Sequence, residues 1–60
     1  MARITISMRV DNAAFEEGGG SEVARILREL ADVYEECGFH VFANLRDING
    51  NPIGSAKLED

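Results

Sequence analysis

The stretch LRDINGNPIG, residues 45–54, decides how this chain folds, because the Asn49-Gly50 pair within it predicts a β-hairpin. Asn-Gly is the strongest short-range hairpin signal, since both residues accept positive φ in a two-residue turn. The segments on either side, 39–48 and 52–59, are expected to be the two strands. The second half of the chain is therefore expected to be antiparallel.

Two turn lengths are compatible with this hairpin, and they give different registers. A two-residue turn keeps apolar residues together on one face by pairing Leu45 with Gly54, Ala43 with Ala56 and Val41 with Leu58. A three-residue turn with a bulge would instead put Val41 opposite Lys57, so we expect the two-residue turn. Pro52 has no amide hydrogen and is expected at a strand position that need not donate.

The first half of the chain predicts one strand and one helix. Residues 1–10, MARITISMRV, alternate apolar and polar side chains with the period of two that is typical of a half-buried strand. From Ser21 to Cys37, apolar residues recur at spacings of three and four, which predicts an amphipathic helix. Ser21 is expected to be its N-cap, and Gly38 is expected to follow its last residue.

Residues 11–20, DNAAFEEGGG, are expected to form the loop between that strand and the helix. Asn12 is expected to cap a single turn that ends at Phe15, and the three consecutive glycines disfavour regular structure beyond it. Free amides before a helix attract anions, but the GGGS run lacks the lysine of a phosphate-binding loop. We therefore expect a hinge, also because three carboxylates crowd this segment: Glu16, Glu17 and Glu22.

The order strand, helix, strand, strand predicts an α+β fold for a single domain, residues 1–60. One helix is expected to cover one face of a three-stranded sheet. A right-handed crossover makes the first two strands parallel. Placing the third strand between them makes every neighbouring pair antiparallel, so we expect strand order 1-3-2, with 1-2-3 as the alternative.

Size and charge limit the functions that this chain can have. A chain of 60 residues buries only about 60% of its unfolded surface, and one cysteine cannot form an intrachain disulfide, so a homodimer is one source of added stability. The net charge of −5 argues against general affinity for nucleic acid. Without a secretory signal pattern or a run of about 20 apolar residues, a soluble cytoplasmic protein with no membrane contact is expected.

The hairpin also imitates a calcium loop. Asp47, Asn49 and Asn51 match three of its ligand positions. Pro52 and Leu58, however, occupy the positions that need a glycine and a bidentate glutamate. A plain turn is therefore expected.

Cys37 and His40 have the spacing of half a zinc site, but no further cysteine or histidine completes it. Ser55 is a candidate cross-strand neighbour of His40, but no orienting carboxylate is evident, so a catalytic triad is not expected. The sequence predicts no enzyme, no cofactor and no metal site.

Basic and aromatic side chains are expected on the sheet face that the helix leaves uncovered. The residues expected to face the helix are Ile4, Ile6, Met8, Val41, Leu45 and Leu58. The residues expected on the open face are Arg3, Arg9, His40, Phe42, Arg46 and Lys57. Sheets that stack bases use such a surface, so a small nucleic-acid-binding or dimeric regulatory module is the alternative function.

The helix is expected to expose more acidic than basic side chains, with Arg25 and Arg28 only partly compensating. Its carboxylates are Glu22, Glu29, Asp32, Glu35 and Glu36, and Glu16 and Glu17 adjoin them in the loop. Carboxylates near the end of a helix oppose its dipole. The carboxylates of Glu29, Asp32 and Glu36 lie along one side of the helix at a spacing of roughly 5 to 6 Å, close to that of successive phosphates on a DNA strand. We therefore expect a partner-binding surface for a basic groove.

In the segments DNAAF, EVARILRELAD and LRDINGNPIG, the sequence resembles small proteins of unassigned function from bacteriophages, prophages and plasmids of proteobacteria. The shared motifs are structural, so the resemblance implies no catalytic residue. It implies a setting in which short acidic proteins act as anti-CRISPR or anti-restriction inhibitors. The function expected is stoichiometric inhibition of a host defence protein or ribonucleoprotein complex, such as a CRISPR effector, in the bacterial cytoplasm. Partial DNA mimicry and steric blocking are both open, and no direct contact with nucleic acid is expected.

Overall fold

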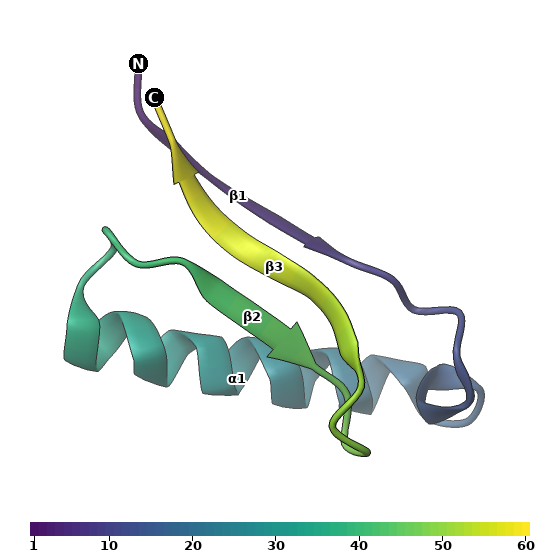
Figure 1. Ribbon diagram of the computed structural model, residues 1–60. Coiled ribbons are helices and arrows are strands. Elements are labelled where there is room, and N and C mark those ends of the chain that lie inside the picture. Colours follow the sequence, from purple (N-terminus) through teal and green to yellow (C-terminus); the bar gives the residue numbers. More distant parts are fainter.

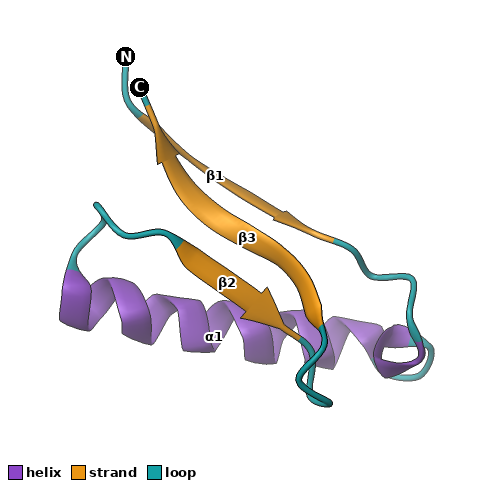
Figure 2. Cartoon of the chain, viewed as in Figure 1, coloured by secondary structure: helices purple, strands orange, loops and turns teal.

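A three-stranded antiparallel sheet and one long helix make up the computed structural model, which describes all residues 1–60 (Figure 1). The elements are β1 (Arg3–Met8), the 3-10 turn η1 (Ala13–Phe15), α1 (Gly19–Cys37), β2 (Ala43–Arg46) and β3 (Pro52–Glu59). The strand order is β1-β3-β2, with β3 antiparallel to both neighbours. The expected α+β fold and strand order 1-3-2 are confirmed, and Figure 2 shows α1 running along the β2 side of the sheet.

The hairpin has the expected register but not the expected turn. Leu45 pairs with Gly54 and Ala43 with Ala56, as predicted, but β2 is only four residues long and the predicted pair of Val41 with Leu58 is absent. The Asp47 N–H donates to the Asn51 carbonyl at 3.0 Å, which leaves three residues in the turn. The two-residue turn was therefore wrong.

A β-bulge reconciles the longer turn with the predicted register. Arg46 pairs with Pro52 while Leu45 pairs with Gly54, so Ile53 is an extra residue on β3. Only Gly50 in the turn has positive φ, at 85°, so Asn49 does not contribute the left-handed conformation that was expected of it. The bulge absorbs the additional turn residue, and the pairs beyond it keep apolar side chains on one face.

The helix begins two residues earlier than predicted. Its N-cap is Gly18, in the left-handed conformation and without a side-chain cap, so the assignment of Ser21 as N-cap was wrong. Part of the glycine run is thus helical and not a hinge. At the other end, the prediction holds: Gly38 follows the last helical residue and its N–H donates to the Tyr34 carbonyl at 2.9 Å. Asn12 also caps one turn, because its Oδ1 accepts the Ala14 N–H at 2.9 Å.

The hydrophobic core lies between α1, β2 and β3. Its buried members are Phe15, Ile26, Leu30, Leu45, Ile53 and Ala56. Ile53 belongs to it because the bulge turns this side chain inward. The expectation that β1 is covered holds for Met8, which packs against the core, but was wrong for Ile4 and Ile6, which remain 42% and 44% exposed because α1 packs on β2. In Figure 1 the β1–β3 ribbon rises away from the helix.

Candidate partner-binding surface

Glu22 near the start of α1 is a buried carboxylate and not a surface one. Only 8% of the residue is exposed, so its assignment to an exposed acidic surface was wrong. Its two oxygens accept from Nε and Nη2 of Arg25 at 2.8 and 3.0 Å, and one also accepts the Ile48 N–H at 2.8 Å. The Arg25 contact is the main cause that lowers the pKa of Glu22, against the effect of burial. Glu22 therefore fastens the hairpin turn to the helix.

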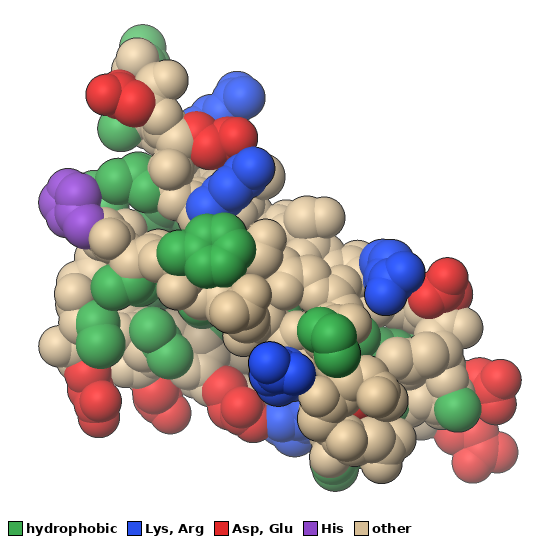
Figure 3. Space-filling view, viewed as in Figure 1, with side chains coloured by type: hydrophobic (Ala, Val, Ile, Leu, Met, Phe, Trp, Pro, Cys, Tyr) green, Lys and Arg blue, Asp and Glu red, His purple; other side chains and the backbone are tan.

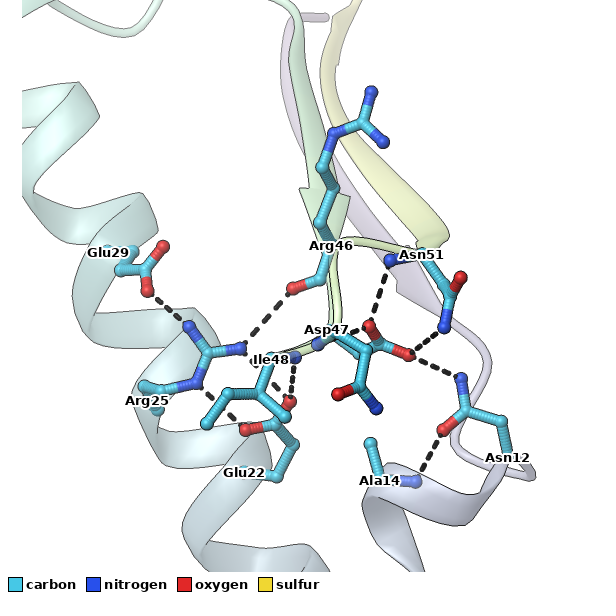
Figure 4. Close-up of polar contacts among 10 residues, drawn as sticks. Asn12, Ala14, Glu22, Arg25, Glu29, Arg46, Asp47, Ile48 and Asn51 are labelled. Atoms are coloured by element: carbon cyan, nitrogen blue, oxygen red, sulfur yellow. Dashed lines mark hydrogen bonds and ion pairs between the residues drawn. The ribbon is translucent and has the colours of Figure 1, made fainter.

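Arg25 lies between two carboxylates of the same helix (Figure 4). Besides Glu22, it pairs with Glu29 one turn further along, and its Nη2 lies 3.4 Å from the Arg46 carbonyl of β2. The hydrogen bond with Glu22, together with both negative charges, raises the pKa of Arg25. One arginine thus compensates charge in the first half of α1 and supports the end of β2.

Asp47 organises the turn from within. Its Oδ1 accepts the backbone N–H groups of Asn49 and Asn51, both at 2.9 Å. Its Oδ2 accepts the side-chain amides of Asn51 at 3.1 Å and of Asn12 at 2.8 Å. Burial alone would raise the pKa of Asp47, but these hydrogen bonds outweigh it and lower the pKa. The polar residues that imitate a calcium loop hold the turn and join it to the loop before η1.

We define the acidic helix face as Glu29, Asp32, Glu35 and Glu36, all of which are exposed. Only Glu29 has an ion pair, the one with Arg25, and the last turn of α1 carries no basic residue. In Figure 3 the acidic side chains follow the lower edge of the molecule, where α1 runs. The negative charge in this half of the helix is therefore largely uncompensated.

The acidic residues predicted in the loop do not join this face. Glu16 and Glu17 are exposed but precede α1, whereas Glu35 and Glu36 lie in its last turn. At 1.5 Å per residue, the helix between the two pairs is about 28 Å long. The structure thus divides the predicted surface into two separate groups, with Glu22 removed from both.

The open sheet face is less basic than predicted because Glu59 lies on it. Glu59 pairs with Arg3 of β1 at 3.4 Å and with Lys57 of its own strand at 3.5 Å. Thr5 Oγ1 donates to it at 2.6 Å, which is the main cause that lowers the pKa of Glu59. Arg3 and Lys57, two of the six residues predicted for the open face, are therefore paired with a carboxylate that was not predicted there.

The other predicted members of the open face lie mostly at its margins. Phe42, immediately before β2, is 63% exposed. Arg46 is exposed at the end of β2 and donates to the Gly50 carbonyl at 3.1 Å. His40 lies in a bend and not in a strand, with its ring centroid 4.1 Å from that of Phe39. It is therefore not the cross-strand neighbour of Ser55, which pairs with Asn44 and Ser7. Arg9 follows β1 and is exposed.

Between α1 and β2 there is a shallow cleft of about 90 Å³ that the sequence did not predict. Ile26, Leu30 and Val33 line it from the helix, and Arg46 and Glu29 stand among its polar residues. Cys37 is free and exposed. No group of three or more histidine, cysteine, aspartate or glutamate side chains is arranged to hold a metal ion.

The architecture defines a small α+β protein whose polar clusters lie around α1. Comparison of the chain with protein families, curated proteins and solved structures finds no match. None of its helices has the length and apolar character needed to cross a membrane. The surfaces of the molecule, and not a relative of known function, are therefore the basis for the proposals below.

Proposed function

We propose that this protein is an anti-CRISPR-like inhibitor that binds a host defence complex stoichiometrically through the acidic helix face. The observation that carries the proposal is the absence of any ion-pair partner for Asp32, Glu35 and Glu36 at the end of α1. Carboxylates in the last turn oppose the helix dipole at a cost of about 0.3 to 1 kcal/mol each. A surface that costs stability and contributes nothing to packing is expected where binding maintains it.

The contacts of Glu22 show which charges of α1 serve the fold and which are free to bind a partner. Glu22 and Arg25 neutralise one another while they secure the hairpin. By contrast, Asp32, Glu35 and Glu36 have no ion-pair partner. Together with Glu29 they present carboxylates along the helix at a spacing of roughly 5 to 6 Å, similar to that of successive phosphates of a DNA strand. A groove lined by lysine and arginine in a nucleic-acid-handling complex is the complementary partner. Occupying that groove would exclude the nucleic acid.

The resemblance to small proteins of phages, prophages and plasmids supports the same setting. Proteins of such elements meet defence ribonucleoproteins in the cytoplasm of a bacterial host, and inhibition by binding requires no catalytic group. Only part of this surface is acidic, so partial DNA mimicry combined with steric blocking is the mechanism proposed. The partner is a protein or ribonucleoprotein, and the chain itself contacts no nucleic acid in this mechanism.

A charge-matched pair of variants tests the proposal. Asp32→Lys/Glu36→Lys and Glu16→Lys/Glu17→Lys change the net charge equally, at opposite ends of α1. Tagged wild-type protein should recover a nucleic-acid-handling defence complex from host lysate and reduce its binding to target DNA. The first variant should lose both properties, and the second should keep them. Equal behaviour of the two variants would refute a role for the acidic helix face, provided that circular dichroism shows both to be folded.

The open sheet face supports the second candidate, a nucleic-acid-binding module. Phe42 is 63% exposed just before β2, and Arg46 and Lys57 are exposed on β2 and β3. Aromatic and basic side chains together stack on and neutralise single-stranded nucleic acid in other sheets. The pairing of Lys57 with Glu59 works against it. Gel shifts with single-stranded RNA and DNA at physiological salt distinguish the candidates. Binding that is lost in both Phe42→Ala and Arg46→Ala would favour this module over the inhibitor.

A further inference from the structure

β1 is an edge strand with unpaired backbone groups along one side. β3 pairs with its other side, and the Arg9 N–H just beyond the strand donates to the Ile53 carbonyl at 2.8 Å. Because successive residues of a strand direct their amides to opposite sides, the N–H and C=O groups of Ile4 and Ile6 point away from β3. These groups are available to a further strand.

From Ile4 to Met8, β1 has none of the features that protect an edge strand. Natural edge strands are shielded by proline, bulges, short length or charged side chains. β2, the other edge, is four residues long and ends at a bulge. β1 has six regular residues, and from Ile4 to Met8 it contains no charge, glycine or proline. The two edges of the sheet therefore differ in their readiness to pair.

The same strand carries the apolar surface that α1 leaves uncovered. Ile4 and Ile6 lie on the helix side of the sheet, opposite Leu58 and Ala56 of β3, and both are more than 40% exposed. The outermost strand of the sheet thus presents two isoleucines beside its free backbone groups, where a neighbouring strand would contact both.

The whole molecule is also more extended than a compact monomer of its mass. Its accessible surface is 4397 Å², whereas a folded monomer of 6.6 kDa is expected to expose about 3,900 Å². Its radius of gyration is 12.0 Å, against about 10.4 Å for a compact chain of this length. The excess of about 500 Å² is close to what one partner buries in a small protein interface.

We propose that β1 is the interface of a symmetric homodimer, in which β1 of a second copy pairs antiparallel with it across a two-fold axis. The two sheets then form one continuous six-stranded sheet. Thr5 lies opposite Thr5 of the partner, and Ile4 lies opposite the partner's Ile6. This pairing satisfies the free edge and gives each exposed isoleucine an apolar neighbour.

Charge selects this register over its nearest alternative. Shifting the two-fold axis from Thr5 to Ile6 keeps as many strand residues paired, but it puts Arg3 directly opposite Arg9 of the partner on both sides of the axis. Like charges directly opposite one another are destabilising. With the axis at Thr5, Arg3 faces Ser7. The proposal is independent of the proposed function, because the acidic helix face stays free in the dimer.

Sedimentation equilibrium measures the assembly directly. The wild-type protein is expected to be dimeric at micromolar concentration, and Ile6→Lys is expected to be monomeric. Ile48→Lys is the matched control, because Ile48 is 69% exposed but lies in the hairpin turn. Circular dichroism and thermal unfolding establish that each variant is folded. A monomeric wild type, or a dimer that Ile6→Lys leaves intact, would overturn the proposal.

Disulfide trapping in a Cys37→Ser background tests the register without relying on a charge in β1. At a non-hydrogen-bonded pair the Cα atoms are about 4.5 Å apart, so Thr5→Cys should form an intermolecular disulfide on mild oxidation. Two Ser7→Cys residues would lie about 14 Å apart along the strands and should remain reduced. Faster cross-linking of Ser7→Cys than of Thr5→Cys would show that this two-fold arrangement is wrong.

Discussion

Gly54 is the position where a single methyl group should damage this fold most severely. A Cβ atom there would lie 1.9 Å from the carbonyl oxygen of Ser7, 2.7 Å from Cα of Met8 and 2.8 Å from the Ser7 carbonyl carbon. All three are backbone atoms of β1, so no side-chain rotation relieves the overlap. Gly54→Ala therefore requires that β1 and β3 separate at this point.

The expected loss is large in proportion to the stability of so small a domain. Overpacking a well-packed site typically costs about 1 to 3 kcal/mol, and the upper value applies where backbone must move. A domain of 60 residues is stable by roughly 3 to 9 kcal/mol. With each kcal/mol worth roughly 4 to 8 °C, Gly54→Ala should lower the Tm by about 12 to 24 °C.

Gly20→Ala is the matched control for this substitution. Gly20 lies in α1, has no left-handed φ, and has open space where its Cβ would be. The same change there should raise stability by up to about 1 kcal/mol, because alanine favours the helix. Thermal unfolding followed by circular dichroism compares the two. At roughly 4 to 8 °C per kcal/mol, a Tm within about 2 to 3 °C of wild type corresponds to a loss of under about 1 kcal/mol. Such a small loss for Gly54→Ala would refute the close approach of β1 and β3.

Further predictions concern the turn, the core and pH. Gly50→Val should cost about 1 kcal/mol or more, because φ is 85° there and a β-branched residue resists it; an unchanged Tm would contradict this. Leu30→Ala should cost about 2 to 5 kcal/mol in urea titrations, whereas the exposed Leu27→Ala should cost under about 1, and similar losses would discount the core assignment. Folding lowers the pKa values of Glu22 and Asp47, so both ionised carboxylates stabilise the folded protein. This stabilisation is complete above their pKa values in the unfolded chain, near 4, and is lost as the pH falls through their lower pKa values in the folded protein. The urea concentration at half-unfolding should therefore decrease as the pH is lowered from about 5, and a constant midpoint down to pH 3 would contradict this.

The hairpin shows which part of a β-structure the sequence determines. The pairing of Leu45 with Gly54 follows from keeping apolar residues on one face, and the structure has it. The turn length does not follow, because an Asp47 carboxylate with four donors stabilises a longer turn than Asn-Gly alone favours. The bulge at Ile53 then restores the register. Facial alternation survives such a local change because it is set by burial.

Glu22 shows what sequence patterning cannot reveal. Its spacing of three residues from Arg25 is that of an ordinary exposed ion pair on a helix, like the four-residue spacing between Arg25 and Glu29. It is buried only because the hairpin turn, 26 residues later, lies against the start of α1 and offers the Ile48 N–H. The carboxylates of the acidic helix face recur along the helix at comparable spacings, but no loop packs against them and they remain exposed. Tertiary placement therefore decides which of these acids are available to a partner.

The exposure of Ile4 and Ile6 has a geometric cause. Neighbouring strands are about 4.8 Å apart, and a helix with its side chains is about 10 to 12 Å wide, so one helix covers about two strands. Here α1 packs on β2, and the core that it shares with β3 includes Ile53 and Ala56, whereas in β1 only Met8 is packed against this core. The alternation in residues 1–10 correctly identifies an apolar face. It contains no information about whether the helix or another chain covers that face.

The two proposed surfaces should respond to salt in opposite ways. Attraction between the acidic helix face and a basic groove is screened over about 8 Å at physiological ionic strength, so partner binding should weaken as salt rises. Two chains that each carry a net charge of −5 repel one another, while near the two-fold axis Arg3 is already paired with Glu59. Screening should therefore strengthen the β1 dimer. A dimer that dissociates with added salt would mean that ion pairs, and not Ile4 and Ile6 with their free backbone groups, hold the two copies together.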